Sequence, residues 1–159
     1  MSAVSSDTDV PQQTIVTLDL EGVLVPEIWI AVAERTGIPE LRRTTRDEPD
    51  YDVLMKGRLA ILDQHGLTMS TIADVISGLG PMEGAKDFLD RLRDRTQVVI
   101  LSDTFEQFGA PLMRHLGMPT ILCHQLIVRD DRIVDYRLRM PDQKRHAVNA
   151  FRGLNYRVV

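Results

Sequence analysis

Two short apolar runs, rich in β-branched residues, are the strongest strand signals in this chain. They cover residues 14–18 and residues 97–101, the second of which reads QVVIL. Continuous apolar runs of this length are typical of strands buried on both faces of a parallel sheet. Weaker strand signals lie at residues 120–122, at 126–128 and 133–138 on either side of the turn 129–132, and at 156–159.

Between these strands, apolar residues recur at spacings of three and four positions, which predicts helices. The predicted helices cover residues 26–37, 53–64, 70–78, 83–95, 105–116 and 144–154. We expect Phe88 on the inward face of the fourth helix and Leu154 on that of the sixth. The fifth helix follows Ser102-Asp103-Thr104, a sequence typical of a helix N-cap.

The alternation of strands and helices predicts an α/β fold with a doubly wound parallel sheet. A group of predicted helices interrupts the alternation directly after the first strand. We therefore expect a core domain made of residues 14–26 and 81–159, with a small helical cap inserted at residues 27–80. Residues 1–13 are polar and acidic, and we expect them to form a flexible N-terminal extension.

Composition excludes several classes of function. The chain has 159 residues, of which 43% are hydrophobic, enough for the core of one domain. A net charge of −4 without a basic stripe argues against nucleic-acid or anionic membrane partners. The N-terminus lacks the basic start and apolar stretch of a signal peptide. A single cysteine, Cys123, leaves no internal disulfide, so we expect a reducing, cytoplasmic location.

Two acidic residues, Asp19 and Glu21, follow the first apolar run, and Gly22 lets the chain turn immediately afterwards. The carboxyl ends of strands are the place where open α/β sheets bind ligands. A purely structural turn at Asp19 would produce the same residue types, and these types alone favour neither interpretation.

Three segments, DLEGVLVPEIW at residue 19, ILSDTF at residue 100 and the region of Lys144, resemble three motifs of the haloacid dehalogenase superfamily. Within it, the chain is most similar to the phosphoserine phosphatases, in particular to bacterial members that also transfer phosphate to homoserine. The resemblance covers residues 14–159. It implies a Rossmann-like core with a helical cap, dependence on Mg²⁺, and cleavage of phosphoserine through an aspartyl-phosphate. It leaves hydrolysis and transfer to homoserine both open.

The resemblance also implies a role for individual residues. Asp19 would be the nucleophile and a metal ligand, and Glu21 would be the general acid and base, with its position also contributing to the metal site. Lys144 would neutralise the charges of Asp19 and of the phosphate, although the neighbouring Arg145 is an alternative for this role. Ser102 would bind a phosphate oxygen, helped by the positive end of the helix that we expect to start there.

Substrate recognition is assigned in the same way. Glu27 and Arg58 match residues that hold the amino-acid part of phosphoserine, where a carboxylate suits the ammonium group and a guanidinium suits the carboxylate. Asp103 replaces a glycine of typical phosphoserine phosphatases, and we expect its carboxylate to face the substrate's ammonium group or a bound alcohol. The four histidines show no metal-ligand spacing, and we expect surface or core positions for them.

The family's fourth motif, an acidic loop of the G-D-x-x-N-D type, has no counterpart up to Val159. We therefore expect a fold that is incomplete at its C-terminal side, weaker metal binding, and self-association through an incomplete sheet edge. This leaves an alternative function open: a weakly active or non-catalytic domain that binds phosphorylated ligands.

Overall fold

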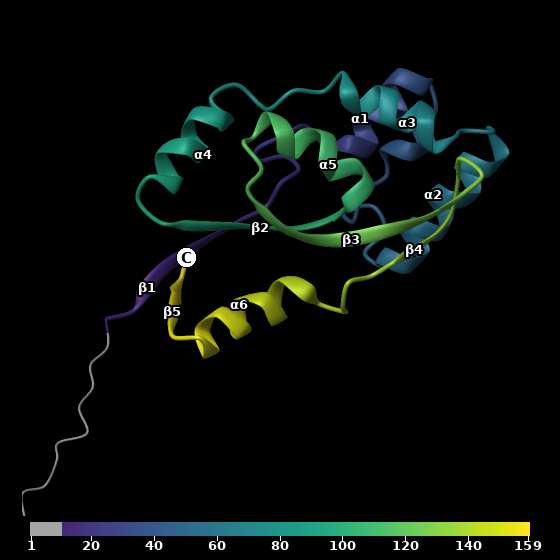
Figure 1. Ribbon diagram of the computed structural model, residues 1–159. Coiled ribbons are helices and arrows are strands. Elements are labelled where there is room, and N and C mark those ends of the chain that lie inside the picture. Colours follow the sequence, from purple (N-terminus) through teal and green to yellow (C-terminus); the bar gives the residue numbers. More distant parts are fainter. Residues whose placement is uncertain (1–10) are drawn as a thin grey trace, which may run out of the picture.

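The computed structural model describes residues 11–159, which form one five-stranded sheet flanked by helices (Figure 1). The strand order is β4-β3-β2-β1-β5, in which β4 runs antiparallel to β3 and the other neighbouring strands are parallel. The strands are β1 (Gln13–Leu18), β2 (Gln97–Phe105), β3 (Thr120–Arg129), β4 (Arg132–Arg137) and β5 (Tyr156–Val158). The α/β fold predicted from the sequence is confirmed.

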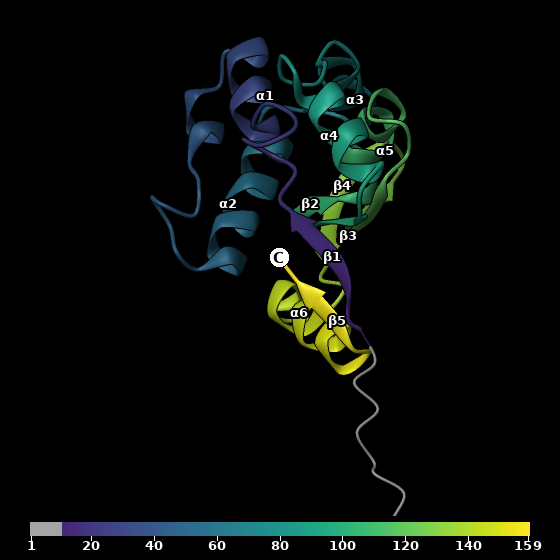
Figure 2. The same cartoon turned by 90° about the vertical axis from the view of Figure 1, so that its left-hand side faces the viewer.

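Helices cover both faces of this sheet. Helices α4 (Ala85–Arg93) and α5 (Glu106–His115) lie on one face and α6 (Gln143–Gly153) lies on the other (Figure 1). Strand β2 alternates between the two sides: Ile100 packs in the cluster that contains residues of α4 and α5, whereas Val99 and Leu101 pack in the cluster that contains residues of α6. Figure 2 shows β5 beside β1, with which it pairs in parallel.

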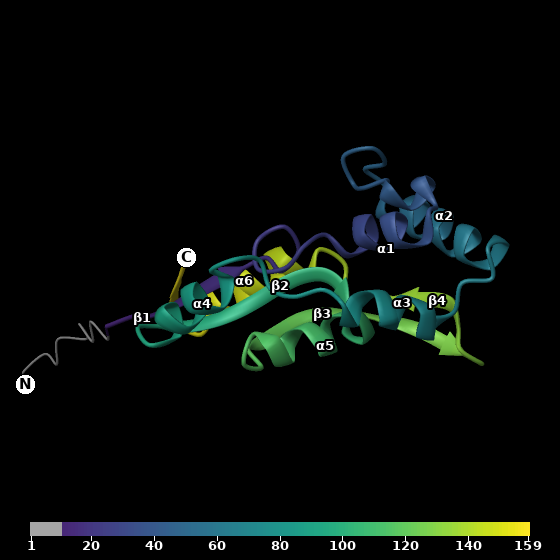
Figure 3. The same cartoon turned by 90° about the horizontal axis from the view of Figure 1, so that it is seen from above.

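Four helices separate β1 from α4 in the sequence, and we refer to them as the insert helices. They are α1 (Ile28–Thr36), the 3₁₀ helix η1 (Pro39–Arg42), α2 (Tyr51–Gln64) and α3 (Met69–Ser77). Seen from above, α1 and α2 lie beyond the end of β1 and beside the β3–β4 hairpin (Figure 3). One cavity is lined by Asp19 and Glu21, which follow β1, and by Trp29 of α1 and Arg58 of α2, so a ligand there can contact both parts of the fold.

The β3–β4 hairpin holds the insert helices through polar contacts. Tyr136 on β4 donates a hydrogen bond of 2.5 Å to Asp52 on α2, and Arg132 contacts Asp63 at the other end of α2 over 2.5 Å. At the hairpin turn, Asp131 accepts hydrogen bonds from the backbone N–H and the hydroxyl of Ser70. Contacts at three points fix the insert helices relative to the sheet.

Several local predictions are wrong. Strand β2 continues to Phe105, which pairs with His124 of β3 after a register shift, so Ser102-Asp103-Thr104 is part of the strand and not a helix N-cap. Phe88 is 50% exposed because α4 buries Ala85 and Leu89 instead.

Leu154 is 69% exposed because α6 ends at Gly153 and the chain then leaves the helical periodicity. The two weak strand signals at residues 120–122 and 126–128 form the single strand β3. The first strand starts at Gln13, inside the predicted extension, of which residues 1–10 lie outside the described part of the chain.

Candidate active site

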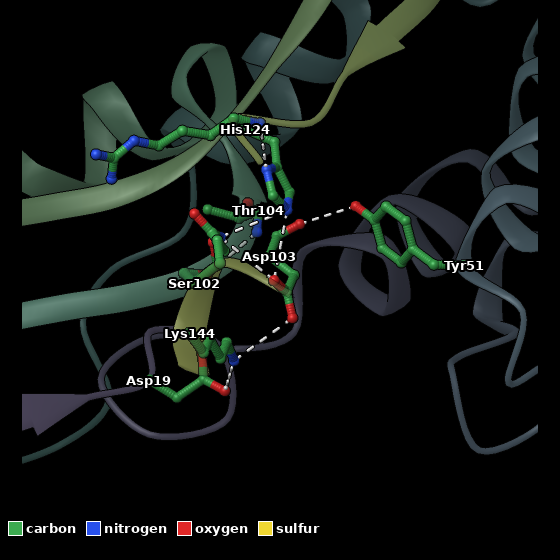
Figure 4. A network of polar contacts seen from close by, with 9 residues as sticks. Asp19, Tyr51, Ser102, Asp103, Thr104, His124 and Lys144 are labelled. Carbon is green, nitrogen blue, oxygen red and sulfur yellow. Dashed lines mark hydrogen bonds and ion pairs between the residues drawn. The ribbon is translucent and has the colours of Figure 1, made fainter. Parts of the chain in front are cut away.

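An ion pair between Asp19 and Lys144 lies at the end of β1, although 125 positions separate the two residues in the sequence. One oxygen of Asp19 accepts a hydrogen bond of 2.8 Å from the backbone N–H of Leu20, and the other contacts Lys144 Nζ over 2.8 Å (Figure 4). Burial lowers the pKa of Lys144, but the bonds to Asp19 and Asp103 outweigh it, so the net shift is upward. Lys144 therefore stays charged beside the predicted nucleophile.

Glu21 lies in the turn that follows, where Gly22 adopts a positive φ of 72° that favours glycine. Its Oε1 accepts a hydrogen bond of 2.8 Å from the backbone N–H of Ile28, the first residue of α1. Burial raises the pKa of the Glu21 carboxyl, with a smaller contribution from the nearby Glu27, and outweighs the bond to Ile28. Glu21 is thus a carboxyl group prepared to hold a proton, as a general acid requires.

Ser102 is buried in β2, and its hydroxyl oxygen accepts a hydrogen bond of 3.2 Å from the backbone N–H of Thr104. Helix α5 begins four residues later, at Glu106. The expected help from a helix N-terminus at Ser102 is therefore absent, because the influence of the helix dipole is concentrated in the first turn. The Ser102 side chain still lines the same cavity as Asp19 and Lys144.

Asp103 uses both of its carboxylate oxygens within the protein. Oδ1 lies 3.4 Å from His124 Nε2 and 3.3 Å from Gln143 Nε2, and Oδ2 lies 3.6 Å from Lys144 Nζ (Figure 4). The contact with His124 is the largest cause of the low pKa of Asp103, which is about 2. Lys144 and Gln143 also lower this pKa, whereas burial raises it. The oxygens that we expected to face a substrate ammonium group already have partners in this arrangement.

Arg58 is a buried cation, only 7% exposed, on helix α2. Its guanidinium lies 4.6 Å from the centre of the Trp29 ring, and Nη2 donates a 2.8 Å hydrogen bond to the backbone oxygen of Arg43. Burial lowers the pKa of Arg58 to about 10, still well above neutrality. Its Nε has no hydrogen-bond partner, and within residues 11–159 no carboxylate lies within 4.0 Å of the guanidinium. Such a group favours an anionic ligand.

All seven site residues predicted from the sequence line one cavity of about 180 Å³. They are Asp19, Glu21 and Glu27, which lie between β1 and α1, Arg58 of α2, Ser102 and Asp103 of β2, and Lys144 of α6. Lys144, and not the alternative Arg145, contacts Asp19 in this structure, because the Arg145 guanidinium pairs with Asp142 over 2.6 Å. A second cavity of about 280 Å³ adjoins the first and shares Thr45, Tyr51, Asp103 and Lys144 with it.

Sequence reasoning missed three residues that the fold brings to this site. Tyr51 of α2 donates a hydrogen bond of 2.9 Å to the backbone oxygen of Asp103. His124 and Gln143 bind the Asp103 side chain and are both buried. The one available signal was a polar histidine inside the apolar run of β3, which periodicity alone does not separate from a core residue.

The cavity offers few protein ligands for a metal ion. Among residues 11–159, no group of three or more His, Cys, Asp or Glu side chains is arranged to hold one. Mg²⁺ commonly binds through one or two carboxylates together with water and substrate phosphate. Asp19 and the neighbouring Glu21, which line the same cavity, would supply the carboxylates of that minimal donor set.

Comparisons with known proteins decide the family. The chain is 64% identical over 146 residues to a phosphoserine phosphatase of Pseudomonas syringae pv. tomato and spans 62% of that protein's length. It is equally identical to the phosphoserine phosphatase ThrH of Pseudomonas aeruginosa, 71% of which it spans. The chain belongs to the phosphoserine phosphatase family. No family model matches it.

Solved structures share the fold of this phosphoserine phosphatase family member at low sequence identity. A phosphoserine phosphatase from T. onnurineus superimposes with a TM-score of 0.70 at 22% identity, covering 92% of this chain and 73% of that one. A phosphoserine phosphatase in its apo form gives 0.72 at 18% identity, with 90% and 72% covered. Within the described part of the chain, no helix combines the length and the apolar character needed to cross a membrane.

Proposed function

We propose that this protein hydrolyses O-phospho-L-serine to L-serine and phosphate through a phosphorylated Asp19. The observation that carries the proposal is the shared cavity, which gathers a carboxylate paired with a lysine, a second carboxyl with a raised pKa, and a buried arginine. Family membership at 64% identity to two phosphoserine phosphatases supports the same substrate. We also propose a cytoplasmic location, as expected from the cysteine content.

The reaction divides into two displacements at phosphorus. In the first, an oxygen of Asp19 forms a bond to phosphorus while the bond to the serine oxygen breaks, and Glu21 gives its proton to that leaving oxygen. In the second, Glu21 takes a proton from water, whose oxygen attacks phosphorus and releases phosphate from Asp19. Each proton transfer of this kind contributes about 10²–10⁴-fold. At the end, Asp19 is ionised again and Glu21 is protonated again.

Charge repulsion is the main obstacle to the first step. Two unit charges 4 Å apart repel by about 4 kcal/mol at an effective dielectric near 20, so a carboxylate meets a phosphate dianion with about twice that. Lys144, 2.8 Å from Asp19, offsets part of this repulsion. A bound Mg²⁺, held through Asp19, would supply further positive charge at the phosphate.

Arg58 and Glu27 are proposed to select the amino-acid part of the substrate. Arg58 lines the cavity, and no carboxylate of residues 11–159 lies within 4.0 Å of its guanidinium, so a substrate carboxylate would give it an anionic partner. Glu27 is exposed at the mouth of the same cavity, before α1, where it can accept hydrogen bonds from an ammonium group.

Transfer of the phosphoryl group to homoserine would use the same first displacement. The second displacement would then use the homoserine hydroxyl in place of water, with Glu21 again accepting the proton. Incubation of the protein with phosphoserine and homoserine, followed by separation of phosphohomoserine from free phosphate, distinguishes the two outcomes.

The test of the proposed function compares the native protein with Asp19→Asn and with Asp87→Asn, a control on the exposed side of α4. We expect phosphate release from phosphoserine by the native protein and by the control, loss of at least about 10³-fold in Asp19→Asn, and reversible loss with EDTA. Mass spectrometry of the acid-quenched native protein should place one phosphoryl group on Asp19. Absence of turnover in the native protein with Mg²⁺ would favour the alternative, a domain that binds phosphorylated ligands without cleaving them.

A further inference from the structure

His124 has its two ring nitrogens in defined positions. It lies on β3, is 3% exposed, and its Nδ1 accepts a hydrogen bond of 3.0 Å from the backbone N–H of Arg139. A neutral imidazole whose Nδ1 is an acceptor carries its hydrogen on Nε2. That nitrogen lies 3.4 Å from Asp103 Oδ1 (Figure 4). The backbone of Arg139 therefore selects the tautomer that turns a donor toward Asp103.

Gln143 holds the same carboxylate from another side. Its Nε2 donates a hydrogen bond of 2.6 Å to the backbone oxygen of Ser102 and lies 3.3 Å from Asp103 Oδ1. Gln143 is the first residue of α6 and directly precedes Lys144. The same side chain thus fixes the start of α6 against β2 and fixes one oxygen of Asp103.

The other oxygen of Asp103 then faces the lysine. Asp103 Oδ2 lies 3.6 Å from Lys144 Nζ, which also lies 2.8 Å from Asp19. A lysine ammonium on a flexible stem has many accessible positions, and the Lys144 side chain is 38% exposed. Asp103 can restrict the positions of the Lys144 ammonium only if the Asp103 carboxylate is itself fixed. Its contacts with His124 and Gln143 fix it.

We propose that His124 is a positioning residue that, through Asp103, keeps the Lys144 ammonium beside the phosphoryl group during the reaction. The inference rests on the proposed function. The physical reason lies in the intermediate. Once an oxygen of Asp19 is bonded to phosphorus, the Asp19 carboxylate has lost its negative charge and binds Lys144 less strongly. Asp103 remains ionised throughout and continues to anchor the lysine, so both displacements find the positive charge in the same place.

The test uses two substitutions of His124, each of which can replace the hydrogen bond of only one ring nitrogen. In His124→Gln, the amide nitrogen can occupy the place of Nε2 and still donate to Asp103. In His124→Asn, the shorter side chain can occupy the place of Nδ1 and still accept from the Arg139 N–H, but it cannot reach Asp103. We expect His124→Gln to keep kcat for phosphoserine within about threefold, and His124→Asn to lower it about tenfold with KM nearly unchanged. His115→Asn, an exposed histidine at the end of α5, is the control.

A double-mutant cycle separates positioning from packing. His124 also lies within 6.4 Å, centre to centre, of the rings of Tyr51 and Phe105, so its loss has a structural cost as well. In an Asp103→Ala background, His124→Asn should lower kcat less than twofold further, because the lysine is already released. Equal losses of kcat in both backgrounds, or equal kcat for the Gln and Asn variants, would overturn the inference.

One measurement does not depend on turnover. Long-range proton–nitrogen NMR of the native protein should show His124 protonated on Nε2 and unprotonated on Nδ1. The opposite tautomer would overturn the inference even if the protein is an active phosphatase. Absence of phosphoserine turnover in the native protein, with the expected tautomer present, would instead contradict the proposed function and would remove the reaction that this positioning serves.

Discussion

The hydroxyl of Tyr51, at the start of insert helix α2, donates a 2.9 Å hydrogen bond to the backbone oxygen of Asp103 at the end of β2. The bond joins the insert to the core inside the site, because Tyr51 lines both of the adjoining cavities. Burial raises the pKa of the Tyr51 hydroxyl well above its usual value, so it remains a donor at every physiological pH. The position of the insert helices over Asp19 therefore depends partly on this one bond.

Replacement of Tyr51 by Phe should weaken substrate binding more than it weakens the fold. We expect KM for phosphoserine to rise about three- to tenfold, because the insert residues Glu27 and Arg58 are less firmly held over the cavity. The free energy of unfolding should fall by about 1 kcal/mol, the net value of one hydrogen bond. Steady-state kinetics and urea denaturation measure the two effects. Tyr156→Phe, on β5 outside both cavities, is the matched control, and an equal rise in KM there would contradict the prediction.

Arg58 is predicted to recognise the substrate's carboxylate and not its phosphate. Arg58→Met keeps much of the buried volume and the contact with Trp29 while removing the charge. We expect KM for phosphoserine to rise by about 10–100-fold, the value of a charge-assisted hydrogen bond, with little change in turnover of an aryl phosphate that lacks the carboxylate. Arg42→Met, an exposed arginine of the insert, should change neither. An equal loss on both substrates would assign Arg58 to the fold or to the phosphate site.

Glu21 should contribute to stability in a way that depends on pH. Its pKa in the folded state lies above the ordinary value of 4.5, so the folded protein binds the extra proton between these two values. The free energy of unfolding therefore falls as the pH rises from the ordinary pKa to the raised pKa of Glu21. It stays lower at higher pH, where the buried Glu21 carboxyl is ionised. Glu21→Gln removes this cost and should raise Tm by roughly 1–4 °C at pH 8, with a smaller difference at pH 4.

The same substitution should lower activity. A glutamine cannot give or accept the proton, so Glu21→Gln should reduce kcat by about 10²–10⁴-fold while the protein becomes more stable. For the native protein, kcat/KM should fall at high pH as the raised pKa of Glu21 is passed, because only the protonated acid supports the first displacement. Two results would contradict the assignment of Glu21 as a buried general acid and base. One is a Tm of Glu21→Gln at pH 8 equal to that of the native protein, and the other is retained activity in this variant.

Leu112 and Leu154, one inside α5 and one just after α6, should respond differently to truncation. Leu112 of α5 is fully buried, and Leu112→Ala should lower the free energy of unfolding by about 2–5 kcal/mol. Leu154 is 69% exposed, and Leu154→Ala should stay within about 0.5 kcal/mol of the native value. Chemical denaturation of the two variants measures the difference directly. A large loss of unfolding free energy in Leu154→Ala would show instead that Leu154 is buried, as the periodicity predicted.

The elements of the fold were largely predictable from local pattern. The apolar run of β2, the 3.6-residue periodicity of α1 and α2, and the turn at Asp130 and Asp131 are each encoded within a few consecutive residues. Local pattern failed at the ends of elements, as at Ser102-Asp103-Thr104, where pairing of Phe105 with His124 extends β2 beyond the residues that would otherwise cap a helix. Strand pairing between segments distant in the sequence decides such a boundary.

The candidate site divides in the same way. The positions of Asp19 and Glu21 after a buried strand follow from the local sequence, because β-branched residues, two acids and a glycine specify a strand and a turn. Resemblance to a family added Lys144, Arg58, Ser102 and Glu27. By contrast, the contacts of Asp103 with His124 and Gln143, and of Arg145 with Asp142, become visible only in the folded protein. The directions of these side chains depend on contacts between β2, β3 and α6, which are far apart in the chain, so no local pattern encodes them.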